Sequence, residues 1–110
     1  MMKYDTELFQ IKADLCKTLA HPKRQMVIAE LRSGEKMVSV IAEAIDVSQS
    51  STSHHLAVLR DAGMVSIRRD GSKIYYSLVD PKITEACDLM HNVLMTRMAK
   101  SKELANKFVR

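Results

Sequence analysis

Short polar side chains gather within residues 49–54, and longer cationic ones follow around residue 70. Five of the six positions in the first group carry side chains that can hydrogen-bond outward: Gln49, Ser50, Ser51, Ser53 and His54. A helix with such short side chains can approach the floor of the DNA major groove and hydrogen-bond to base edges. The pattern therefore favours a helix that reads DNA bases, although the solvated first turns of an ordinary helix would look similar.

Cationic side chains flank Asp70-Gly71-Ser72, which is typical of a tight hairpin turn because glycine adopts positive φ without strain. The three cations are Arg68, Arg69 and Lys73. At the tip of a hairpin, side chains of this length reach phosphates or the minor groove. An ordinary solvated turn also carries charge, so both interpretations stay open for these three residues.

Cys16 and Cys87 are the only cysteines, and they are too far apart in the sequence to form a paired CxxC motif. If the helices that carry them meet, the two thiols can be closed by a disulfide or a sulfur bridge, and that link would change helix packing. His91 lies four residues after Cys87 on the same helical face and would complete a soft three-ligand metal site. In the third interpretation, both cysteines are small buried apolar residues.

Apolar residues at helical spacing predict two helices before residue 34. The first covers residues 5–21, ends before Pro22, and carries Leu8, Ile11, Leu15 and Leu19. The second begins at Pro22 and is expected to bury Met26, Val27, Ile28 and Leu31. We expect His21 at the C-terminal end of the first helix, where the helix dipole favours a cation.

The polar residues 49–54 fall within a predicted helix-turn-helix. A short helix carrying Val38, Ile41, Ala44 and Ile45 ends at Asp46, a residue type that tolerates left-handed geometry. Ser48 then caps a helix over Gln49–Asp61 that is expected to bury Thr52, Leu56 and Leu59. His55 lies at the edge of this apolar stripe, and we expect a partly buried, hydrogen-bonded ring there rather than a contact to a base.

A β-hairpin and a long helix complete the predicted elements. The strands cover residues 64–69 and Lys73–Leu78. The last helix has Asp80 as its cap and Pro81 at its first position, and it runs to about residue 108. The predicted fold is therefore mainly α with a β-hairpin, in the order α-α-α-α-β-β-α of a winged helix-turn-helix.

Length and charge limit the classes of function. The 110 residues suffice for one domain, residues 1–110, and carry a net charge of +4. No apolar run exceeds four residues and no secretion signal is present, which predicts no membrane span and a cytoplasmic location. Without a Gly-rich phosphate loop, an HExxH motif or an acid pair, we predict neither an enzyme nor a cofactor.

Residues 15–78 closely resemble the ArsR/SmtB family of winged-helix repressors. Four motifs carry the resemblance: LAHPKR at residues 19–24, SQSSTSHHL at residues 48–56, LRDAGMV at residues 59–65 and RRDGSKIYYSL at residues 68–78. The resemblance implies a homodimer formed by the helices of residues 5–21 and 81–108. It also implies binding to a double-stranded DNA operator and release from it by an inducer.

The sequence departs from the metal-sensing members of that family. The Cys-Val-Cys type of pair is absent from the third helix, which has Met37 and Ser39 in the equivalent stretch. The Asp-x-His pattern of the last helix is also absent, because Lys82 follows Asp80 at that spacing. Three hypotheses remain: a repressor that senses oxidant or reactive sulfur at Cys16 and Cys87, a metal-responsive repressor that adds His91, and a winged helix that only binds proteins.

Overall fold

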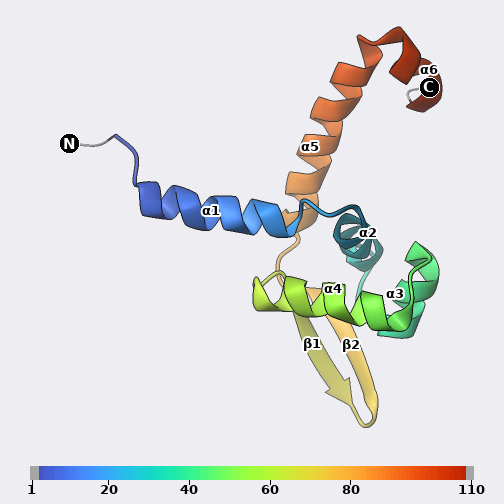
Figure 1. Cartoon of the computed structure of the whole chain (residues 1–110). Coiled ribbons are helices and arrows are strands. Elements are labelled where there is room, and N and C mark those ends of the chain that lie inside the picture. The colour runs from blue at the N-terminus through green and yellow to red at the C-terminus, as the bar shows by residue number, and fades with distance from the viewer. Residues whose placement is uncertain (1–2, 109–110) are drawn as a thin grey trace. The chain divides into compact units, whose positions relative to one another are not determined.

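The elements follow the predicted order, with one additional short helix at the C-terminal end. The computed structural model describes residues 3–108 (Figure 1). Its backbone contacts divide the chain into two units, Met1–Asp80 and Pro81–Arg110. The single domain predicted over residues 1–110 includes residues 1–2 and 109–110, which lie outside the described residues.

Three helices enclose the core of the first unit: α2 (Pro22–Leu31), α3 (Val38–Ile45) and α4 (Gln49–Asp61). Their fully buried side chains include Val27, Ile28, Ile41, Leu56 and Leu59. The prediction that Met26 is buried is wrong, because this side chain is 44% exposed. At 3.6 residues per turn, it projects away from the stripe formed by the other apolar residues of α2. In α3, the buried residues are Ile41, Ala42 and Ile45.

A left-handed residue makes the turn between α3 and α4, as predicted. Asp46 has φ 55° and ψ 52°, and its N–H donates to the Glu43 carbonyl at 3.3 Å. The N–H of Val47 donates to the Ala42 carbonyl at 3.1 Å. These bonds end α3 and leave only residues 46–48 before α4 begins.

Two antiparallel strands, β1 (Val65–Asp70) and β2 (Lys73–Leu78), form a hairpin that we call the wing. It projects away from α4 in Figure 1, and Gly71 in its turn has the predicted positive φ, 61°. β1 begins one residue later than predicted. An additional antiparallel bridge joins the wing to the loop before α3, where Lys36 and Tyr76 exchange backbone hydrogen bonds of 3.0 and 2.9 Å.

The first helix, α1 (Thr6–Thr18), exposes its apolar residues. Asp5 caps it by accepting from the Leu8 N–H at 3.1 Å. The helix ends at Thr18, three residues before the predicted end at residue 21. None of its residues is buried, and the apolar side chains that are 45% to 60% exposed are Leu8, Phe9, Ile11 and Leu15.

The second unit contains α5 (Lys82–Ala99) and α6 (Lys102–Phe108) in place of the single helix predicted to residue 108. The break follows a tightened last turn, in which the N–H groups of Lys100 and Ser101 donate to carbonyls three residues back. The predicted cap, Asp80, lies one residue too early, because Pro81 is the residue at the N-cap of α5. Within residues 3–108, no helix is long and apolar enough to cross a membrane.

Candidate nucleic-acid interface

α4 turns its polar residues to solvent and its apolar residues to the core, as predicted. The Ser48 hydroxyl oxygen caps the helix by accepting from the Ser51 N–H at 3.1 Å. Thr52, Leu56 and Leu59 are each 0% exposed. The five residues of α4 that are predicted to contact DNA are all exposed, and we call them the α4 polar face: Gln49, Ser50, Ser51, Ser53 and His54.

His55 is half-buried as predicted, but it does not form the predicted hydrogen bond with any residue from 3 to 108. Its Nδ1 is buried without a hydrogen-bond partner among the described residues. The ring packs instead against the ring of His21, with 4.6 Å between centroids, and the His54 ring lies at 6.0 Å. Burial lowers the pKa of His55, and the charges of His21, Arg24 and His54 lower this pKa further.

His21 begins α2 rather than ending α1. Its backbone is extended, with φ −123° and ψ 125°, and its Nδ1 accepts from the Lys23 N–H at 3.1 Å. Pro22 follows in the first turn, where a missing N–H breaks no hydrogen bond. The predicted dipole interaction with the C-terminal end of α1 is therefore wrong, because that helix already ends at Thr18.

Two side chains in the first turn of α2 also donate hydrogen bonds to carbonyls at the ends of two other helices. Lys23 Nζ donates to the carbonyl of Ile45 at the end of α3, at 3.1 Å. Arg24 Nε donates to the carbonyl of Thr18 at the end of α1, at 2.8 Å. Carbonyls in the last turn of a helix lack partners within that helix, so both donors satisfy groups that would otherwise need water. We call residues 21–24 the α2 entry segment.

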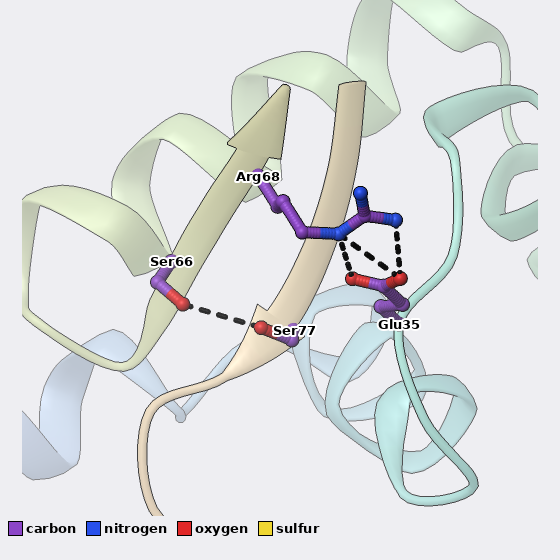
Figure 2. A network of polar contacts seen from close by, with 4 residues as sticks. All are labelled: Glu35, Ser66, Arg68 and Ser77. Carbon is purple, nitrogen blue, oxygen red and sulfur yellow. Dashed lines mark hydrogen bonds and ion pairs between the residues drawn. The ribbon is translucent and has the colours of Figure 1, made fainter. Parts of the chain in front are cut away.

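Arg68 is held by a carboxylate that the sequence did not point to. Its guanidinium donates to both carboxylate oxygens of Glu35, with Nη2 at 2.6 Å and Nε at 3.0 and 3.2 Å (Figure 2). The guanidinium carbon also lies 4.6 Å from the centroid of the Tyr75 ring. The hydrogen bonds from Arg68 lower the pKa of Glu35. The pair ties β1 to the same loop that forms the Lys36–Tyr76 bridge.

Arg69 and Lys73 are exposed near the turn of the wing. Because successive residues of a strand point to opposite faces, Arg69 projects from the face opposite Arg68. Neither Arg69 nor Lys73 forms an ion pair with any residue from 3 to 108. The three predicted wing cations therefore differ, since Glu35 offsets the charge of only one of them.

The predicted sensing residues lie on α1 and α5. Cys16 is exposed on α1, and Cys87 is half-buried on α5 in the second unit. His91, which belongs to the metal hypothesis, is exposed on α5. In the described part of the chain, no group of three or more His, Cys, Asp or Glu residues is arranged to hold a metal ion.

The helix-turn-helix and the start of the wing match a known family model. Residues 21–66 match the model described as bacterial regulatory protein, arsR family. The chain is also 34% identical over 85 residues to the biofilm growth-associated repressor of Xylella fastidiosa. This match covers 77% of this chain and 75% of that protein. The chain belongs to the ArsR family.

Solved structures agree with the ArsR assignment. The crystal structure of M. tuberculosis Rv0081 has a TM-score of 0.78 and 34% identity, and the match covers 84% of this chain and 94% of that one. The homodimeric winged helix-turn-helix DNA-binding domain of Mb0332 from Mycobacterium bovis has a TM-score of 0.74 and 26% identity, with coverage of 86% and 87%. The predicted fold class and family are confirmed, and this ArsR-family protein is a transcriptional regulator, not an enzyme.

Glu35 should titrate below the ordinary pKa of a glutamate, and Arg68→Met should return its pKa toward that value. Because the pKa of Glu35 is lowered in the folded state, the pair adds to the free energy of unfolding above the ordinary pKa, and this contribution is lost as the pH falls through the lowered pKa. An NMR titration of the side-chain carboxyl carbon measures the shift. Arg69→Met, on the opposite face, is the matched control and should leave the titration of Glu35 unchanged. An unchanged titration in Arg68→Met would contradict the pair.

Proposed function

We propose that the protein is a homodimeric, cytoplasmic repressor that binds a double-stranded DNA operator through α4 and the wing, and that an inducer acting on α1 and α5 releases it. The exposed α4 polar face carries the proposal, because Thr52, Leu56 and Leu59 anchor the opposite side of the same helix in the core. Membership of the ArsR family and the repressor name of the Xylella fastidiosa relative support it.

The α4 polar face and the wing have different proposed roles. Gln49 and the serines of α4 are short enough to hydrogen-bond to base edges and would set sequence preference. Arg69 and Lys73 would contact phosphates, which contributes to affinity for every sequence. Glu35 holds Arg68 through Nε and Nη2 and offsets its charge, so in the observed geometry Arg68 orients the wing.

Binding to a DNA fragment that carries the protein's own promoter should be specific and should weaken as salt rises. If each subunit places about three to four cations near phosphates, with Arg69 and Lys73 among them, the slope of log K against log salt is about −5 to −7. Fluorescence anisotropy at several salt concentrations measures this slope. A flat response would contradict the proposal and favour a winged helix that binds only proteins.

Two substitutions separate the proposed roles in the same assay. Arg69→Ala should weaken binding to promoter and unrelated DNA alike and reduce the salt slope by about one per subunit. Gln49→Ala should reduce discrimination at one base position per half-site by about 1–3 kcal/mol and leave the salt slope unchanged. Equal effects of both substitutions on both readouts would reject this division.

Exposed apolar side chains on α1 and α5 support the proposed homodimer. Ile11 of α1 is 60% exposed, and Leu89 and Met90 of α5 are each 67% exposed. Apolar surface of this kind commonly marks a protein–protein contact. A two-fold axis through such a contact would place two α4 helices on half-sites about 34 Å apart.

Ile11→Lys should weaken dimerisation by about tenfold or more, because an unpaired lysine in an apolar contact costs upwards of about 1.4 kcal/mol. Gln10→Lys adds the same charge at the neighbouring exposed position and is the control. Sedimentation equilibrium measures both dissociation constants, and operator affinity should fall only in the variant that dissociates. Equal dimerisation of the two variants would exclude this face of α1 from the interface.

Cys16 and Cys87 are the proposed sensing residues, one on each proposed dimerisation helix. An oxidant would accept two electrons as the two thiols lose their protons and form a disulfide. That covalent link would restrict the arrangement of α1 against α5 and thereby of the two α4 helices. A hundredfold loss of operator affinity requires only about 2.7 kcal/mol of difference between the linked and open states.

Operator affinity of the wild type should fall after treatment with a mild oxidant or a persulfide donor, and Cys16→Ser and Cys87→Ser should not respond. Anisotropy before and after treatment measures the change, and added reductant should reverse it. Loading with zinc instead tests the alternative in which His91 joins the cysteines. If the wild type is indifferent to oxidant and persulfide, or both variants respond as it does, Cys16 and Cys87 do not sense the inducer.

A further inference from the structure

Two histidine rings join the α2 entry segment to α4. The His21 ring accepts the Lys23 N–H through Nδ1 and packs against the His55 ring at 4.6 Å between centroids. On α4, His55 comes directly after His54 of the α4 polar face. Its own Nδ1 is buried without a hydrogen-bond partner among the described residues. The contact between the two rings therefore links the N-cap of one helix to the helix that carries the candidate DNA-binding residues.

Both imidazoles must be neutral for this arrangement to hold. A protonated His21 carries a hydrogen on each ring nitrogen, so it cannot accept the Lys23 N–H at the N-cap. A proton on His55 places a charge in a half-buried site that also faces the guanidinium of Arg24 from α2 and the ring of His54 from α4. These groups and burial lower the pKa of His55, so each resists its protonation.

The same segment also contacts α1 and α3. Arg24 donates to the Thr18 carbonyl at the end of α1, and Lys23 donates to the Ile45 carbonyl at the end of α3. Loss of the His21 cap would therefore disturb the turn of α2 that contacts α4 and is bonded to the ends of α1 and α3. A change of charge at this point acts on the placement of α4 without any direct contact to DNA.

We propose that His21 is a positioning residue for α4: the neutral His21–His55 pair holds α4 in its DNA-binding arrangement, and protonation of the pair on acidification releases the operator. The inference rests on the proposed function, because it assumes that α4 reads DNA. Each proton taken up on release lowers operator affinity by about tenfold per pH unit at the acid end of the titration. A proton on His54 would have the opposite effect on operator affinity, because a positive charge on an exposed histidine next to DNA strengthens binding.

The test measures affinity for the promoter fragment from about pH 8 to about pH 5.5, across the range in which histidine titrates, at constant salt. Wild-type affinity should fall as the pH decreases. The slope of log affinity against pH should be reduced in two variants. His21→Asn keeps an N-cap acceptor but does not titrate, and His55→Phe keeps a ring without a basic nitrogen. His91→Asn removes an exposed imidazole of α5 and should keep the wild-type slope.

Two further measurements make each outcome decisive. Circular dichroism at every pH separates release of DNA from unfolding, and NMR signals of the ring protons report directly whether His21 and His55 titrate where affinity changes. A wild-type affinity that is constant or rises on acidification overturns the inference. An unchanged dependence of affinity on pH in both His21→Asn and His55→Phe also overturns it. Absence of DNA binding even at the alkaline end of this range, about pH 8, would instead overturn the proposed function.

Discussion

Burial of one side of α4 determines where the candidate DNA-binding side chains of that helix lie. Thr52, Leu56 and Leu59 are fully buried and recur at helical spacing, so they form one stripe against α2 and α3. Each buried leucine contributes about 1.5–3 kcal/mol, and a rotation of α4 about its axis would expose both. The polar residues at its start therefore stay on the solvent side, whatever their own contribution to stability.

The ends of helices impose a second constraint, because a small core leaves few groups to satisfy their backbone carbonyls. The α2 entry segment meets this need by donating from Arg24 to the end of α1 and from Lys23 to the end of α3. Each such bond contributes about 0.5–1.5 kcal/mol. His21 in the same segment contacts His55 of α4. A single turn of α2 therefore contacts both α1, which the proposed function assigns to dimerisation, and α4, which it assigns to DNA binding.

The wing shows how tertiary contacts divide residues of one type into different roles. Arg68 and Arg69 are neighbours in β1, yet strand geometry sends them to opposite faces. On one face, Glu35 of the loop before α3 accepts hydrogen bonds from Nε and Nη2 of Arg68 and offsets its charge. On the other, Arg69 keeps a charge that no ion pair within residues 3–108 offsets. The positive charge available to a phosphate therefore concentrates toward the turn.

Local patterns in the sequence were sufficient to predict the order of the elements and the left-handed Asp46. They also predicted the bounds of α4, its Ser48 cap and its buried stripe. Each of these features depends on residues within one or two helical turns of one another. The prediction failed at Met26 and at the break between α5 and α6, where apolar spacing alone did not show the buried side or the end of a helix. Only the tertiary structure placed Glu35 against Arg68 and His21 against His55. Each pair joins elements about 33 residues apart in sequence, and no local propensity reports which side chains meet after the chain folds.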